Sequence, residues 1–157
     1  MKLLPDRLEH GWAPYVWLTY FIFFFIDPIL SHAGWRQWAF TGLGTVLFLT
    51  LYFTFFWVGC RGKLWVVAGL VVLGLAYAPF NGGATTFFIF ASAFVPFAVE
   101  TEGRAITLLL TVAAVAALEW KLLHLQNWFL FYACGLALVI GGSNVFFACS
   151  AGHSLAR

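Results

Sequence analysis

The apolar run at residues 128–148 constrains the fold of this chain more than any other feature. Its side chains are almost all hydrophobic. As a helix the run would be about 31 Å long, enough to cross the hydrocarbon core of a bilayer, which is about 30 Å thick. The run therefore predicts a transmembrane helix.

Small residues recur at every fourth position along this run, at Ala133, Ala137 and Gly141. Such a stripe lets two helices approach closely in a membrane, so these are candidate packing residues. Two interpretations are open. In the first, the stripe only holds a helical bundle together. In the second, the helix carries a signal out of the membrane to whatever follows Arg157.

The composition also indicates a membrane protein. Hydrophobic residues make up 63% and charged residues 9% of the 157 positions, which is too little polarity to cover a soluble domain. The net charge of +2 and the absence of a long basic run exclude nucleic acid as a partner. We therefore expect a multi-pass protein of the inner (plasma) membrane, with the lipid bilayer as its partner.

No pattern in the sequence predicts catalysis, a metal or a cofactor. The three cysteines, Cys60, Cys134 and Cys149, lack the paired spacing of disulfide or zinc sites. The four histidines form no i, i+4 pair that could hold haem or a metal. A phosphate-binding loop and a nucleophile–base pair are also missing, so we expect that this chain by itself is not an enzyme.

Six apolar segments predict an all-α, polytopic bundle of six transmembrane helices. They cover residues 14–30, 38–58, 64–77, 85–99, 105–118 and 128–148. With residues 1–13 and 149–157 in the cytoplasm, six of the eight cations lie inside and only Arg36 and Lys121 lie outside. This split follows the positive-inside rule.

Asp27 and Pro28 are candidate signalling residues near the end of the first segment. A carboxylate within the membrane is a functional candidate by default. Proline also ends or breaks a helix. The interpretation favoured by the neighbouring Ser31 is structural, with Asp27 marking the outer end of the first span.

The segments at residues 64–77 and 85–99 are shorter than the bilayer core, and the turn at residues 79–83 separates them. A short span pays a mismatch cost that changes with bilayer thickness, so these helices could sense thickness. The alternative is that they are packed inside the bundle and never contact lipid.

Several stretches resemble the membrane region of DesK-type bacterial sensor histidine kinases. They are the Pro-Tyr-Val-Trp start at residues 14–17, the basic loop at residues 61–63, the run FIFASAFVPFAVETEGRA at residues 88–105, and the final output helix. The resemblance implies a sensor of a membrane or envelope condition that acts, as a homodimer, through a cytoplasmic kinase core and a response regulator.

The kinase core itself is not present in this sequence, because His153 does not match the phospho-acceptor pattern of that family. The competing interpretation is a small six-span transporter or channel subunit. It is less favoured because no segment carries an unambiguous charge at its midpoint.

Overall fold

The computed structural model describes residues 18–123, and this part of the chain is all-α. A 3₁₀ turn, η1 (Leu18–Ile22), leads into the short helix α2 (Phe23–Leu30). The longer helices are α3 (Trp35–Trp57), α4 (Cys60–Tyr77), α5 (Thr85–Ala98) and α6 (Glu102–Leu123), and the 3₁₀ turn η2 (Gly82–Ala84) precedes α5. The predicted all-α class is thus confirmed for the described residues.

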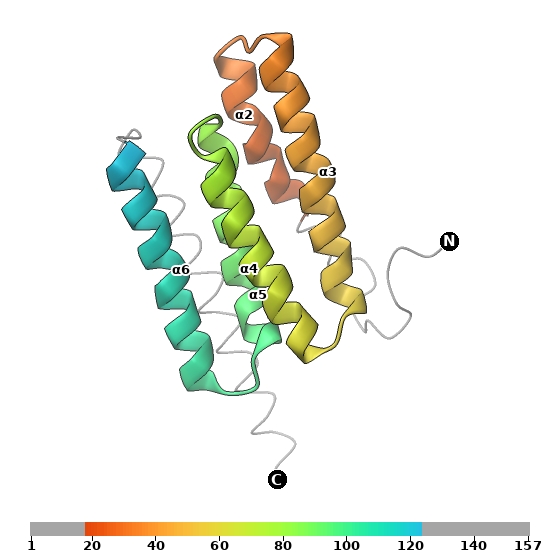
Figure 1. Cartoon of the computed structure of the whole chain (residues 1–157), viewed down its shortest axis with the longest axis vertical. Coiled ribbons are helices and arrows are strands. Elements are labelled where there is room, and N and C mark those ends of the chain that lie inside the picture. Colours follow the sequence, from red (N-terminus) through yellow and green to blue (C-terminus); the bar gives the residue numbers. More distant parts are fainter. Residues whose placement is uncertain (1–17, 124–157) are drawn as a thin grey trace.

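Helices α3 to α6 run alternately up and down, because each connection between them is short (Figure 1). Helix α5 lies behind α4 in this view, α6 lies on one side of that pair, and α2 lies beside one end of α3 (Figure 1). The two most closely packed helices are α4 and α5.

Helix α5 forms the centre of the structure. Twelve of its 14 residues are buried, whereas α3, α4 and α6 each bury only one side. Aromatic rings pack α3 against α5 and against η1. Phe94 of α5 stacks on Phe55 at 4.0 Å between ring centroids, and Phe48 of α3 stacks on Phe21 of η1 at 4.1 Å. Such pairs add about 0.5–1.5 kcal/mol each beyond the burial of their area.

The ends of α3 and α4 follow from the local backbone. Gly34 and Gly59 precede the two helices in extended conformation, and Val58 ends α3 in the same conformation. Helix α4 begins at Cys60, four residues before the predicted segment, because Arg61 and Lys63 are compatible with a first helical turn. The Lys63 ammonium lies 5.2 Å from the centre of the Phe55 ring.

The expectation of six membrane-spanning helices is wrong. The structure contains five α-helices between residues 18 and 123, and α3 alone among them is long and apolar enough to cross a membrane. Helix α2 has only eight residues, and α5 has 14 and is enclosed by its neighbours. Helices α4 and α6 carry charged residues in their end turns, which shorten their apolar parts.

The presence of one helix that is long and apolar enough to cross a membrane is compatible with the predicted membrane location. It does not support the predicted multi-pass arrangement. The predicted cytoplasmic segments at residues 1–13 and 149–157 lie outside the described residues, as does the last apolar run with Ala133, Ala137 and Gly141.

Candidate functional site

The candidate site is a group of polar contacts between α2 and the turn that joins α4 to α5. It begins with Pro28, which lies inside α2 and has no N–H group. In a regular helix the N–H at position 28 would donate to the carbonyl oxygen of Phe24, four residues earlier. The side-chain amide of Asn81 replaces this donor, since Asn81 Nδ2 donates to the Phe24 oxygen at 3.1 Å.

Burial makes this contact important, because Asn81 is only 3% exposed. Its other side-chain atom, Oδ1, accepts a hydrogen bond from the backbone N–H of Gly83 at 2.8 Å. The amide of Asn81 therefore satisfies one backbone acceptor of α2 and one backbone donor of its own turn. An unpaired backbone group in this position would cost about 1–3 kcal/mol.

Asp27 provides the second link between the same two segments. Its carboxylate oxygen Oδ2 accepts a hydrogen bond from the backbone N–H of Gly82 at 3.0 Å, and its side chain is half-buried. The residues Asp27, Pro28, Asn81, Gly82 and Gly83 together are called the polar clamp below. It joins positions that are 55 and 57 residues apart in the sequence.

The backbones of the two segments meet at Gly83. A Cβ atom at this position would lie 2.6 Å from the backbone oxygen of Phe23 and 2.8 Å from the Cα atom of Phe24. These distances are shorter than real Cβ contacts, and the atoms concerned are backbone atoms that cannot turn aside. Glycine is therefore required here by the close approach of α2.

A cavity of about 270 Å³ lies next to the polar clamp, at the first turn of α3. Its walls come from the start of α3 and from the end of α4 with its following turn. The lining residues are Arg36, Gln37, Phe40, Thr41, Tyr77, Phe80 and Asn81. Gln37 Nε2 donates to the backbone oxygen of Phe80 at 3.4 Å across it, and the Phe40 and Phe80 rings stack at 5.8 Å.

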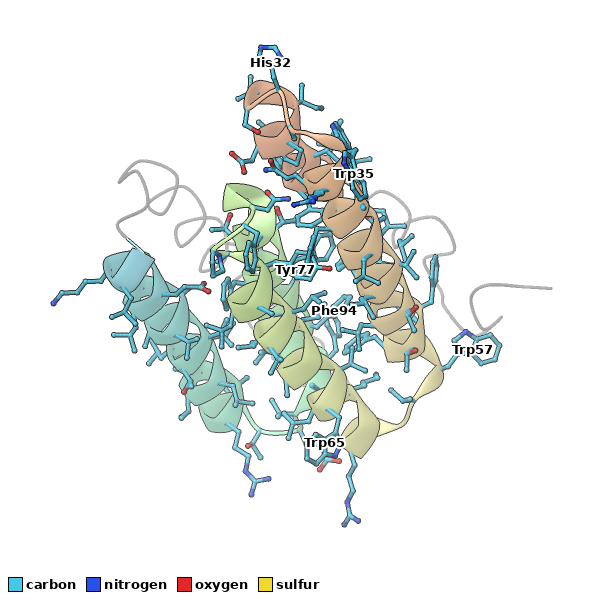
Figure 2. The ribbon with its side chains drawn as sticks, turned by 45° about the horizontal axis from the view of Figure 1, so that its top comes forward. His32, Trp35, Trp57, Trp65, Tyr77 and Phe94 are labelled. Atoms are coloured by element: carbon cyan, nitrogen blue, oxygen red, sulfur yellow. The ribbon has the colours of Figure 1, made fainter. Side chains whose placement is uncertain are left out.

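Charged side chains in the described part lie near the two ends of the helices. Arg61, Lys63, Glu102 and Arg104 belong to the first turns of α4 and α6, at one end. Arg36 at the start of α3 and Lys121 at the end of α6 belong to the other. His32 marks this second end and Trp57 and Trp65 mark the first (Figure 2).

Between these ends the outward side chains are apolar. Val46 of α3, Val72 of α4 and Leu110 of α6 are 62%, 63% and 59% exposed. The middle sections of these helices, and all of α5, contain no charged residue. The result is a hydrophobic band around the structure, about 20 Å high if it covers 14 residues of each helix.

Two of the predicted site residues, Asp27 and Pro28, belong to the polar clamp, and the structure places them in the last turn of α2, which ends at Leu30. Asn81, Gly82 and Gly83 were predicted only as turn residues. The sequence signal that could have indicated these partners is Pro28. A proline inside a helix leaves the carbonyl oxygen four residues earlier without a donor, and a side-chain amide such as that of Asn81 can supply one.

The polar clamp offers no chemistry for catalysis, since a backbone-bound amide and a backbone-bound carboxylate leave no nucleophile paired with a base. Within residues 18–123 there is also no group of three or more His, Cys, Asp or Glu side chains that could hold a metal ion. The arrangement instead holds α2 against the α4–α5 turn.

Comparisons with protein-family models, with curated proteins and with solved structures found no match to this chain. The resemblance to DesK-type sensors therefore depends on the sequence stretches described above.

Proposed function

We propose that this chain is the membrane-embedded input domain of a DesK-type sensor histidine kinase. In this proposal α3 crosses the plasma membrane and the apolar outer faces of α4 and α6 also lie against lipid. The observation that carries the proposal is the hydrophobic band between two charged ends. Exposed Val46, Val72 and Leu110 would be unfavourable in water, where burial of such side chains is worth about 1.5–3 kcal/mol each.

The polar clamp suggests how a change in the bilayer could reach α6. Helix α3 has 23 residues and is about 35 Å long, so it would tilt more in a thinner bilayer. The four residues between Leu30 and Trp35 connect α2 to α3, and the Phe21–Phe48 stack joins the preceding turn η1 to α3. The polar clamp would pass the movement of α2 to the start of α5, and α5 leads directly into α6.

This mechanism differs from direct thickness sensing by the short helices. Helix α5, the counterpart of the predicted short segment at residues 85–99, is enclosed on nearly all sides. For α5 we therefore adopt the alternative interpretation, in which a short helix is packed inside the bundle and does not contact lipid. The bilayer acts on the outer helices, and α5 receives their movement through the polar clamp.

A chimera tests this function. We expect that fusing a DesK-type catalytic core after Arg157, in helical register, gives a kinase whose autophosphorylation changes with acyl-chain length of the vesicles. Mismatch energies of fractions of a kcal/mol per Å, summed over a series that spans about 6 Å in thickness, predict a change of roughly tenfold. The homodimer expected from the resemblance is measured in the same vesicles by cross-linking.

A rate that stays constant over the whole thickness series would contradict this mechanism. The required control is the isolated catalytic core, without the membrane region, which should show no dependence on the lipids.

The proposed orientation can be tested separately with single cysteines at Gly34 and Gly59, after replacing the three native cysteines with serine. Both glycines are exposed, and a Cβ atom at either would meet nothing within 4 Å. Because they lie at opposite ends of α3, a membrane-impermeant maleimide added to intact cells should label Gly34→Cys and not Gly59→Cys. Labelling of both, or of Gly59→Cys alone, would contradict the orientation.

A further inference from the structure

Asn81 and Gly82 form an Asn-Gly pair, the dipeptide in which asparagine loses its side-chain amide most readily, because glycine has no side chain to hinder the approach of its nitrogen. The reaction needs only base and water. The Gly82 nitrogen gives up its proton and attacks Cγ of Asn81, which closes a succinimide ring, and the amide nitrogen takes up a proton and leaves as ammonia. Water then opens the ring to aspartate or isoaspartate. The two other asparagines, Asn127 and Asn144, precede a tryptophan and a valine, whose side chains hinder ring closure.

The polar clamp holds the reacting groups of this pair in place. The Gly82 N–H donates to the Asp27 carboxylate at 3.0 Å, and this charge-assisted bond keeps the proton on the nitrogen. Both polar side-chain atoms of Asn81 are also hydrogen-bonded, Nδ2 to the Phe24 oxygen at 3.1 Å and Oδ1 to the Gly83 N–H at 2.8 Å. Asn81 is only 3% exposed, so base and water have little access to it. The closed clamp therefore protects Asn81 chemically.

The backbone of Asn81 gives a second form of protection. It is extended, with φ −151° and ψ 110°, and at this ψ the Gly82 nitrogen is rotated away from the Asn81 side chain. Ring closure requires the opposite rotation about the Cα–C bond of Asn81. That rotation would carry the Gly82 N–H away from the Asp27 carboxylate. The reaction therefore has to wait until α2 separates from the α4–α5 turn.

The packing of the turn does not require glycine at position 82. A Cβ atom there would lie 3.8 Å from the Asp27 carboxyl carbon, which is an ordinary contact, whereas Gly83 has no room for one. Among the described residues no glycine has a positive φ. Alanine at position 82 thus fits the closed clamp but slows ring closure, so the reactivity of Asn81 can be changed without changing the fold.

We propose that Asn81 is a deamidation site controlled by the polar clamp, and that deamidation makes a transient opening of the clamp permanent. The product has a carboxylate oxygen in place of Nδ2, so it has no N–H group to donate to the Phe24 oxygen. It also brings a negative charge into a buried position. This inference concerns a modification of the chain and does not require the proposed sensor function.

The test follows the Asn81 amide over time in the full chain, purified in an uncharged detergent and kept in a mildly alkaline buffer. Samples are digested at acidic pH and analysed by mass spectrometry, and an unstructured peptide with the sequence of residues 79–85 gives the intrinsic rate. We expect deamidation in the full chain to be about a hundredfold slower than in the peptide, because it requires the loss of the clamp hydrogen bonds. A rate close to that of the peptide would overturn the proposal.

Substitutions separate opening of the clamp from the chemistry. Asp27→Ala removes the acceptor of the Gly82 N–H and should raise the rate about tenfold, as for the loss of a hydrogen bond to a charged group. The matched control is Gln37→Ala, which removes a side-chain donor to the neighbouring Phe80 oxygen and should leave the rate unchanged. Gly82→Ala should slow the full chain and the peptide by the same factor. An unchanged rate in Asp27→Ala, at the helix content of the unsubstituted chain, would overturn the proposal.

Asn81→Asp supplies the product directly and does not depend on the folding of the other variants. We expect it to lower the melting temperature at least as much as Asn81→Ala, because it puts a charged acceptor opposite the Phe24 oxygen. A melting temperature equal to that of the unsubstituted chain would show that the product re-forms the clamp, and this would overturn the proposal.

Discussion

Replacing Gly83 with alanine should destabilise the protein by about 3 kcal/mol, the upper part of the range for adding a methyl group to a fully packed site. The new Cβ atom would have to fit 2.6 Å from the Phe23 oxygen and 2.8 Å from the Phe24 Cα atom. Both are backbone atoms, so the only relief is to move α2 away from the α4–α5 turn. That movement would also lengthen the hydrogen bonds of Asn81 and Asp27 to the opposite segment.

The neighbouring glycine provides a matched control. A Cβ atom on Gly82 would lie 3.8 Å from the Asp27 carboxyl carbon, an ordinary van der Waals distance, and its N–H would still donate to Asp27. Gly82→Ala should therefore be neutral or stabilising by up to about 1 kcal/mol. The measurement is unfolding by SDS titration from mild detergent micelles. Similar effects of the two substitutions would show that α2 does not approach the turn this closely.

The apolar segments of the sequence predicted the long helices but not which of them lies at the centre. The predicted segments at residues 38–58, 64–77, 85–99 and 105–118 correspond to α3, α4, α5 and α6. Helix α5 is apolar on all sides, and periodicity cannot distinguish a helix enclosed by other helices from one that faces lipid. Six equivalent spans were therefore predicted, whereas within residues 18–123 only α3 is long and apolar enough to cross a membrane, and the shorter α5 is enclosed by its neighbours.

Helix ends were less predictable because charged residues were interpreted as loop residues. Arg61 and Lys63 lie in the first turn of α4, and Glu119 and Lys121 lie in the last turns of α6. Long charged side chains have good helix propensity, so a change from apolar to charged residues does not by itself end a helix.

The polar clamp was only half predictable. Asp27 and Pro28 are candidates from the sequence alone, because a carboxylate and a proline are unusual in an apolar segment. Their partners Asn81, Gly82 and Gly83 had the composition of any turn. The hydrogen bonds between them join residues more than 50 positions apart, and a single sequence contains no local pattern for such a contact.

The polar clamp also predicts that Pro28 and Asn81 are energetically coupled. Asn81→Ala removes the donor to the Phe24 oxygen and the acceptor of the Gly83 N–H, two buried contacts, and we expect a loss of about 2–4 kcal/mol in the free energy of unfolding. In a Pro28→Ala background the new N–H at position 28 can donate to the Phe24 oxygen itself. The loss caused by Asn81→Ala should then fall by about 1–2 kcal/mol.

A double-mutant cycle measured by SDS titration gives this coupling, and Gln37→Ala is its control. Gln37 also donates from its side-chain amide to a backbone oxygen, that of Phe80, but the contact is exposed and does not involve α2. Gln37→Ala and Pro28→Ala should therefore be additive within about 0.5 kcal/mol. If Asn81→Ala and Pro28→Ala were equally additive, the Asn81 amide would not be the replacement for the missing proline N–H. The connection between α2 and the α4–α5 turn would then depend on Asp27 alone.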